Sequence, residues 1–157
     1  MMELDQFFTL NYVDESFEEA IKKLIPKKSK NTNHRNQVRR YGSSFPYNNN
    51  IVSANIPPVF DRFANDFAFD SVTINEYLTG QIINWHTDLG KSDIFIISLL
   101  SDSVMQFRLK EKGDVVKELQ VDMPRFSLFR MTGELRSSWE HYLEAQENRI
   151  SIVFRNG

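Results

Sequence analysis

The second half of the chain consists of short segments that are either apolar or alternate between apolar and polar residues. Turn residues lie between these segments. Residues 93–100 include the nearly continuous apolar run Ile94-Phe95-Ile96-Ile97-Ser98-Leu99-Leu100, which is typical of a strand buried on both faces. Residues 103–110 instead alternate between apolar and polar side chains, and Gly113 predicts a hairpin turn before a returning strand. In chain order, strands are predicted at residues 71–78, 93–100, 103–110, 115–121, 126–131 and 149–155.

The first half of the chain contains two segments with helical spacing. Ser16 and Glu19 fit a capping box, and Pro26 ends the helix that they begin. Pro57-Pro58 opens a second helix, whose apolar residues face the core. A further short turn or helix at residues 134–140 precedes His141. Many short strands with few helices predict a mainly β protein, a small barrel with flanking helices.

Composition limits the function classes. The chain has 157 residues, enough for one domain with a sizeable core, and is 41% hydrophobic and 25% charged, as soluble globular proteins are. There is no cysteine, no signal peptide and no apolar run of about 18 residues. We therefore expect an intracellular protein, cytoplasmic or nuclear, without membrane association, and we expect a monomer.

Residues 22–40 form a strongly basic segment in a chain whose net charge is −2. Such a run is usually a solvated loop. Clustered lysines and arginines also supply most of the affinity of proteins for nucleic-acid phosphates. Under that second interpretation, the residues assigned to the nucleic-acid backbone are Lys27, Lys28, Lys30 and Arg35.

Three residues form a candidate metal site. Residues two apart on a strand point to one face, so His86 and Asp88 can offer an imidazole and a carboxylate to one ion. His141, from a distant strand, would complete a facial triad of two histidines and one carboxylate, which suits Fe(II) with open coordination positions. Zinc more often takes three histidines or cysteines. The alternative is a strand-end histidine followed by a turn aspartate.

The last predicted strand carries two arginines on one face. Arg149, Ser151 and Arg155 share that face, and the opposite face is apolar. Guanidinium groups inside a sheet structure need anionic partners, and a dicarboxylate ligand would supply them bidentately. The alternative is a solvent-facing strand edge with two arginines that bind nothing.

Together these residues resemble the AlkB family of Fe(II)- and 2-oxoglutarate-dependent dioxygenases. The family pattern is Asn-x-Tyr-x-x-Gly, His-x-Asp, a distal His and a closing Arg-x5-Arg. The resemblance extends over residues 37–155, and residues 123–134 also look like the family's strand before the distal His. The matching residues are Asn75, Tyr77, Gly80, His86, Asp88, His141, Arg149 and Arg155.

The resemblance implies a double-stranded β-helix, or jelly-roll, barrel that uses Fe(II), 2-oxoglutarate and O2. It implies metal binding by His86, Asp88 and His141. Arg149 and Tyr77 would bind the C5 carboxylate of 2-oxoglutarate. The residues expected near the C1 end or elsewhere on the same face are Asn75, Ser151 and Arg155. One domain is expected over residues 1–157, with an N-terminal extension (1–36), a nucleotide-recognition lid and support helix (37–70) and a catalytic barrel (71–157).

Residues 37–47 resemble the family's nucleotide-recognition lid. Its candidate substrate contacts are Arg39, Arg40, Tyr41 and Tyr47, where an aromatic ring would stack on an extruded base. The alternative is a hairpin whose aromatic side chains pack on the core.

The substrate expected first is an N-alkylated base in DNA or RNA, whose oxidative demethylation would serve DNA repair or RNA modification. A second possibility is hydroxylation of a modified wobble uridine in tRNA, because residues 104–107 and 124–134 look more like that branch of the family. A protein or lipid oxygenase and a non-catalytic nucleic-acid-binding module are the remaining alternatives.

Overall fold

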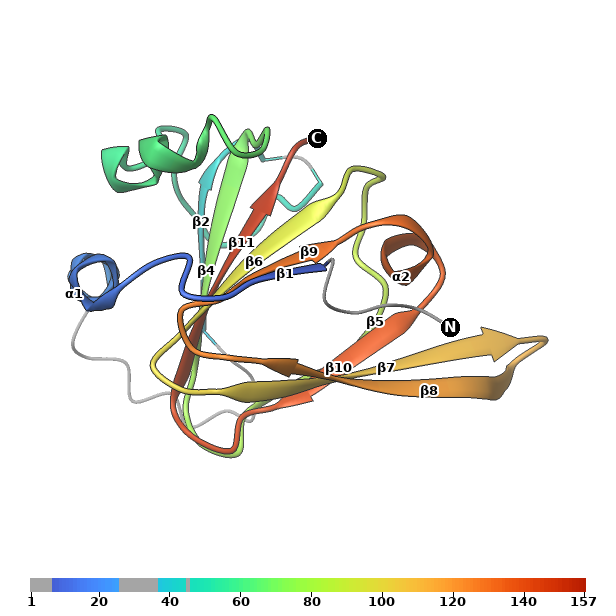
Figure 1. The fold of residues 1–157 in the computed structure, drawn as a ribbon. Helices are drawn as coiled ribbons and strands as arrows, with labels where there is room; N and C mark the ends of the chain where they lie inside the picture. The colour runs from blue at the N-terminus through green and yellow to red at the C-terminus, as the bar shows by residue number, and fades with distance from the viewer. Residues whose placement is uncertain (1–6, 26–36, 45) are drawn as a thin grey trace.

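The structure is a computed structural model that describes residues 7–25, 37–44 and 46–157. Two β-sheets face each other in a sandwich, and the helices lie outside it (Figure 1). The seven-stranded sheet has the order β1-β9-β6-β11-β4-β2-β3, and the four-stranded sheet has the order β5-β10-β7-β8. The elements are β1 (Phe8–Thr9), α1 (Glu15–Lys22), β2 (Gln37–Gly42), β3 (Ile51–Ser53), the 3-10 helix η2 (Pro58–Phe63), β4 (Ser71–Tyr77), β5 (Ile82–His86), β6 (Ile94–Leu99), β7 (Ser103–Glu111), β8 (Asp114–Met123), β9 (Leu128–Met131), α2 (Gly133–Ser137), β10 (Glu140–Glu144) and β11 (Arg149–Arg155).

The large sheet is centred on β11, which pairs antiparallel with β4 and β6. Every residue of β11 is buried, and all but one of β6. For β6 this burial is what its apolar run predicts. Arg149 lies opposite Tyr77, and Ser151 lies opposite Asn75. Because side chains alternate along a strand, this register places these four predicted residues on the face that looks toward the small sheet.

The outer face of the large sheet is covered by α1 and η2 (Figure 1). Phe17 and Ile21 of α1 pack with Phe60 and Phe63 of η2, which confirms the predicted core stripes. The predicted capping residue is wrong. Asp14 caps α1 and accepts a hydrogen bond from the Phe17 backbone N–H at 3.0 Å. Its carboxylate stands before the first turn, where the unpaired N–H groups lie, whereas Ser16 is already inside the helix.

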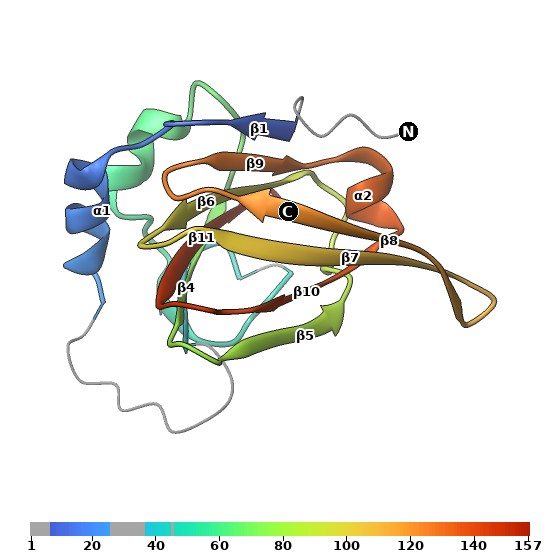
Figure 2. The same cartoon turned by 60° about the horizontal axis from the view of Figure 1, so that its bottom comes forward.

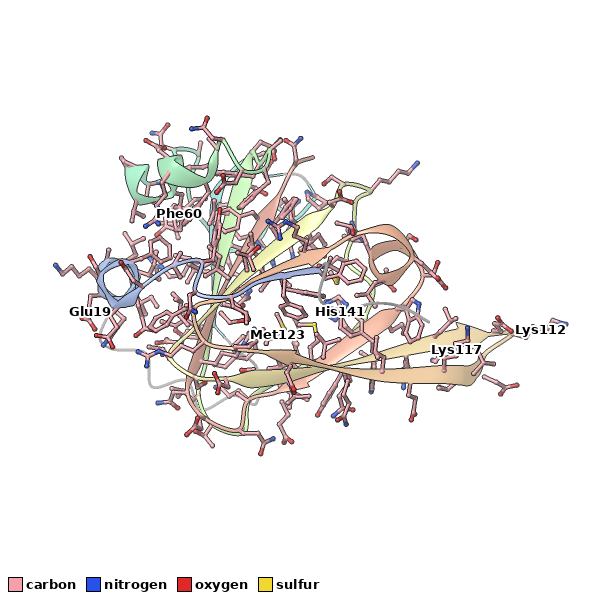
Figure 3. All side chains as sticks on the ribbon, in the orientation of Figure 1. Glu19, Phe60, Lys112, Lys117, Met123 and His141 are labelled. Atoms are coloured by element: carbon pink, nitrogen blue, oxygen red, sulfur yellow. The ribbon has the colours of Figure 1, made fainter. Side chains whose placement is uncertain are left out.

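The second core lies between the sheets. It joins Ile96 and Val153 of the large sheet to Phe107 and Leu143 of the small one. Met123 and His141 point into this space, whereas Lys112 and Lys117 lie toward the free end of the β7–β8 hairpin (Figure 3). The small sheet forms one side of the molecule in Figure 2. This two-sheet arrangement confirms the predicted mainly β fold with flanking helices, a jelly-roll barrel.

Two details differ from the sequence prediction. The strand β5 ends at His86, so Asp88 lies in the turn just beyond it and not on the strand. The short helix before His141 is α2 at Gly133–Ser137 and not residues 134–140, while His141 itself lies on a strand, β10, as predicted. Of the helices that the structure describes, none is long and apolar enough to cross a membrane.

Candidate metal centre and cosubstrate pocket

The three predicted metal ligands come together between the sheets. His86 and His141 are direct partners across the β5–β10 pairing, and their ring centroids are 4.2 Å apart. The turn after β5 brings Asp88 back toward both rings. One ligand atom from each of the three residues lies within 4.8 Å of the others. The arrangement therefore offers two imidazole nitrogens and one carboxylate to a single ion.

Asp88 is the electrostatic centre of this group. Its Oδ1 lies 2.9 Å from His86 Nε2 and accepts a hydrogen bond from the Tyr47 hydroxyl at 3.3 Å. Its Oδ2 accepts a hydrogen bond from Arg155 at 3.3 Å. Burial opposes ionisation of Asp88, but the His86 hydrogen bond and the charge of Arg155 outweigh it and hold the pKa well below its usual range. The carboxylate is therefore ionised and ready to bind a cation at neutral pH.

The two histidines differ in their protonation. Burial lowers the pKa of His141 to about 4, and the nearby Asp88 carboxylate offsets this only in part. Burial also opposes protonation of His86, but hydrogen bonds to Asp88 and to the Asn84 carbonyl outweigh it and raise that pKa. His141 is thus neutral at pH 7, which is the form that a metal requires.

Arg149 forms the floor of the adjacent pocket. The side chain is 1% exposed. Its guanidinium donates to Ser98 Oγ at 3.2 Å and lies 5.4 Å from the centre of the Tyr77 ring. Its Nε has no hydrogen-bond partner, and no carboxylate among the described residues pairs with it. A buried guanidinium without a counter-ion is costly, so the pocket floor fits a carboxylate group of a ligand.

Arg155 lies at the other end of the same strand face. It donates to Asp88 Oδ2 and, at 3.1 Å, to Thr73 Oγ1. Its Nε is likewise buried without a partner. Between the two arginines, Asn75 donates to Ser151 Oγ at 3.3 Å. The strand face therefore offers hydrogen-bond donors and positive charge along its length, as a dicarboxylate ligand requires.

A cavity of about 640 Å³ connects these groups. Its wall includes all three candidate metal ligands and all five candidate cosubstrate residues. The size lies within the range of small-molecule sites. The non-aromatic hydrophobic side chains of its wall are Val38, Ile82, Ile83, Ile96, Met105 and Val153.

The four candidate substrate residues separate into two pairs. Arg40 and Tyr47 line the cavity, and Arg39 and Tyr41 do not. The Tyr47 ring lies 4.5 Å from the Arg40 guanidinium and 4.8 Å from that of Arg155. The backbone N–H of Leu89 donates to its hydroxyl at 3.0 Å. These contacts hold Tyr47 beside Asp88, one of the three candidate metal ligands.

The stacking role expected for Tyr41 is not compatible with the structure. Tyr41 is 6% exposed and packs in the core beneath α1 and η2, opposite Val72. Neighbouring residues of β2 point to opposite faces, so Arg40 faces the cavity while Tyr41 faces the core. The alternative prediction, an aromatic side chain packed on the core, is correct for this residue. The basic residues Lys27, Lys28, Lys30 and Arg35 lie outside the described residues.

Three residues that no sequence motif indicated also support the site. Thr73 accepts hydrogen bonds from both Arg40 and Arg155 at 3.1 Å, and its position two residues before Asn75 was the available signal. Trp85 borders the cavity and stacks on Tyr142, with centroids 5.4 Å apart. Arg136 binds the turn that contains Asp88 through backbone carbonyls, which no sequence pattern indicates.

Comparison with known proteins gives two relatives with similar sequence identity to this chain. The chain is 34% identical over 129 residues to tRNA (carboxymethyluridine(34)-5-O)-methyltransferase ALKBH8 of Macaca fascicularis, which covers 71% of this chain and 19% of that protein. It is 35% identical over 129 residues to the Xenopus tropicalis protein of the same name, covering 71% of this chain and 20% of that protein. The chain thus spans about a fifth of the length of these relatives.

A plant relative and a solved structure extend the comparison. The Alkylated DNA repair protein ALKBH8 homolog of Arabidopsis thaliana is 29% identical over 104 residues, covering 55% of this chain and 30% of that protein. The structure of OsALKBH1 superposes with a TM-score of 0.70 and 13% identity over 95% of this chain and 96% of that chain, which shows a shared fold. No family model matches the chain.

Proposed function

The chain belongs to the AlkB family, and on that premise we propose that it is an Fe(II)- and 2-oxoglutarate-dependent dioxygenase that removes N-alkyl groups from bases in DNA or RNA. One observation carries the proposal. A buried Arg149 without a carboxylate partner among the described residues shares a cavity with the group of His86, Asp88 and His141. Three metal-ligating side chains beside a guanidinium without a counter-ion suit a metal ion and a carboxylate cosubstrate that bind side by side.

The residues present fit both groups. His86, Asp88 and His141 would hold Fe(II). With O2 and 2-oxoglutarate bound, such a centre supplies oxidation of a C–H bond, coupled to conversion of the cosubstrate to succinate and CO2. The residues of the chain would bind and position the cosubstrate. Arg149 and Tyr77 would bind the distal carboxylate.

Three further residues would position the cosubstrate and the metal. Asn75 and Ser151 would orient the cosubstrate end nearer the metal. Together with the hydrogen bond from His86, the charge of Arg155 keeps Asp88 ionised, and Arg155 donates toward the same region. The buried strand face also excludes water from the reacting groups.

The substrate part of the proposal rests on two half-buried residues of the cavity wall. Arg40 and Tyr47 lie side by side, and an aromatic ring with a guanidinium is the usual surface on which an extruded base stacks. We assign residues 37–70 to the lid and its support, and residues 71–157 to the catalytic barrel. A base whose N-methyl group is hydroxylated loses it as formaldehyde.

A second candidate is hydroxylation of a modified wobble uridine in tRNA. The observation that favours it is that two relatives matched over 71% of this chain are named for carboxymethyluridine 34 of tRNA. The proposed residues of the metal and cosubstrate sites are the same for both reactions. Only the group presented to the metal differs.

Both candidates can be tested in one assay. The protein is incubated in air with Fe(II), 2-oxoglutarate and one of two substrates. These are N-methylated oligonucleotides and tRNA whose modified wobble uridine lacks the hydroxyl group. Asp88→Ala is the control. Demethylation predicts formaldehyde and succinate in equal amounts from the oligonucleotides. Wobble hydroxylation predicts a gain of one oxygen on tRNA without formaldehyde. Succinate without either product overturns the substrate assignments, and absence of succinate overturns the dioxygenase.

A further inference from the structure

The charges that line the cavity are unbalanced. Of the described residues in its wall, Arg40, Arg149 and Arg155 are cationic and Asp88 is anionic. Three guanidinium groups thus face one carboxylate, and that carboxylate is bound to Arg155. The cavity wall itself carries a surplus of two positive charges.

Arg40 contributes charge that no direct ion pair among the described residues neutralises. Its guanidinium donates to Thr73 Oγ1 at 3.1 Å, and Arg155 donates to the same oxygen at the same distance. Its Nε donates to the Asn49 carbonyl at 3.0 Å, so its remaining partner is also neutral. No carboxylate within residues 7–25, 37–44 and 46–157 forms an ion pair with it. Two like charges therefore converge on one hydroxyl beside Tyr47.

The excess of positive charge remains when the metal and the cosubstrate are bound. Under the function proposed above, Fe(II) adds two positive charges and 2-oxoglutarate adds two negative charges, which cancel. The positive surplus of the wall then acts on the substrate. A half-enclosed pocket screens such a charge less than bulk water does, so the charge of the base affects its binding.

N-methylated bases fall into two charge classes. Methylation at N1 of adenine or N3 of cytosine leaves a ring with a positive charge at neutral pH. Methylation at N1 of guanine or N3 of thymine and uracil replaces an N–H proton and leaves a neutral ring. Matched members are similar in size and shape and differ in charge and in an exocyclic group, which is an oxygen acceptor in the neutral base and an amino group in the cationic one.

We propose that the pocket selects neutral N-alkylated bases, the N3-alkylated thymine and uracil and the N1-alkylated guanine, over the cationic alkylated adenine and cytosine. Arg40 is the specificity-determining residue. It is the half-buried guanidinium of the cavity wall to which neither Asp88 nor the proposed cosubstrate is assigned as a partner. This inference rests on base oxidation as the proposed function, and it names the class of base.

Matched oligonucleotides test the preference without turnover. Single strands of one sequence carry 3-methyluracil, 3-methylcytosine, 1-methylguanine or 1-methyladenine at one position, so the backbone phosphates are identical and the pyrimidine pair does not differ by a C5 methyl group. Binding to the full chain with Fe(II) and 2-oxoglutarate is measured by fluorescence anisotropy without oxygen. We expect each neutral base to bind at least about fivefold more tightly than its cationic partner, the size expected for one added charge at partial screening. Equal or tighter binding of the cationic bases overturns the proposal.

Two substitutions separate charge from structure. Arg40→Gln removes the charge and keeps a donor, and it should bring the neutral-to-cationic binding ratio close to one. Arg40→Lys keeps the charge and should retain most of the ratio. A merely structural role would weaken both classes alike, so an unchanged ratio in Arg40→Gln overturns the assignment of Arg40. Failure of all four bases to be oxidised in air would overturn base oxidation itself, while the anaerobic binding order still decides the charge preference.

Discussion

Arg136 donates a hydrogen bond to the backbone carbonyl of Asp88 at 3.0 Å, from the helix that precedes the strand carrying His141. The same guanidinium donates to the carbonyls of Leu89, Gly90 and Ser92 at 2.8 to 3.0 Å. The side chain is 5% exposed. One buried arginine thus fixes the turn after β5 relative to the segment that presents the distal histidine, so it positions two of the three candidate ligands.

Replacing Arg136 should therefore weaken metal binding. We predict that Arg136→Met lowers Fe(II) affinity by about 10- to 100-fold, because the groups that orient metal ligands have effects of this size. Anaerobic calorimetric titration measures this directly. Arg130→Met is the matched control, since Arg130 donates to Thr9 on the far side of the sheet. Equal Fe(II) affinity of the two variants would contradict the positioning role.

Arg149 should contribute to ligand binding at the expense of stability. We predict that Arg149→Met reduces 2-oxoglutarate affinity at least about 100-fold, because the variant lacks the charged partner of a buried carboxylate. The unliganded variant should unfold at the same or a higher temperature than the wild type, since an apolar side chain replaces a buried, unpaired charge.

Thermal unfolding with and without 2-oxoglutarate, in the presence of Fe(II) and without oxygen, checks both parts. The ligand should raise the unfolding temperature of the wild type and leave that of Arg149→Met unchanged. Arg39→Met is the control, because Arg39 also has a buried Nε without a partner but lies outside the cavity wall. Stabilisation of Arg149→Met by the ligand would show that the carboxylate binds elsewhere.

The two lid tyrosines should behave in opposite ways. We predict that Tyr47→Ala raises the KM for nucleic acid with little change in the free energy of unfolding. Tyr41→Ala should lower that free energy by about 3 kcal/mol, because it leaves a cavity in the core. Steady-state kinetics and urea denaturation of both variants decide this. A Tyr41 variant that stays stable but loses substrate affinity would restore the base-stacking role to Tyr41.

Glu18 should make the fold sensitive to acid. This buried carboxylate pairs with Arg125 and accepts a hydrogen bond from the Leu100 N–H at 2.8 Å. Burial opposes its ionisation, but these partners outweigh burial and lower its pKa. A carboxyl whose pKa is lower in the folded state adds stability above its unfolded pKa of about 4.3 and loses it as the pH falls through the folded value.

We predict that Glu18→Gln lowers the free energy of unfolding at pH 7 by about 1–2 kcal/mol, since Arg125 is partly exposed and the pair is partly screened. The difference from the wild type should shrink as the pH falls below about 4. Urea denaturation across this pH range measures it, with the exposed Glu118→Gln as control. A difference that stays constant down to pH 3 would rule out the carboxylate as its cause.

The strand that ends the chain shows what the sequence could predict. Strict alternation placed Arg149, Ser151 and Arg155 on one face, and antiparallel pairing then put Ser151 opposite Asn75. The shared face follows from local periodicity, whereas the pairing of Ser151 with Asn75 is a tertiary register that only the structure shows. The same reasoning put His86 and Asp88 near each other, although the strand ends between them.

The lid and the turn after β5 show where that reasoning stopped. Gly42 has a φ of +90°, and a side chain there would meet the Asp70 carbonyl. Because glycine adopts positive and negative φ about equally, the sequence does not determine the direction in which the chain leaves β2. That exit brings Tyr47 to Asp88, 41 residues further on. The four carbonyl contacts of Arg136 also join distant segments, and backbone acceptors leave no residue-specific pattern in a sequence.

The most direct test of the dioxygenase assignment is an anaerobic titration with Fe(II) and 2-oxoglutarate, followed by visible absorbance. We predict a broad metal-to-ligand band that requires both additions, that is absent in Asp88→Ala and Arg149→Met, and that persists in Arg39→Met. Admission of air should then convert 2-oxoglutarate to succinate. A folded wild-type protein that shows neither the band nor succinate would contradict the assignment of the triad and of Arg149.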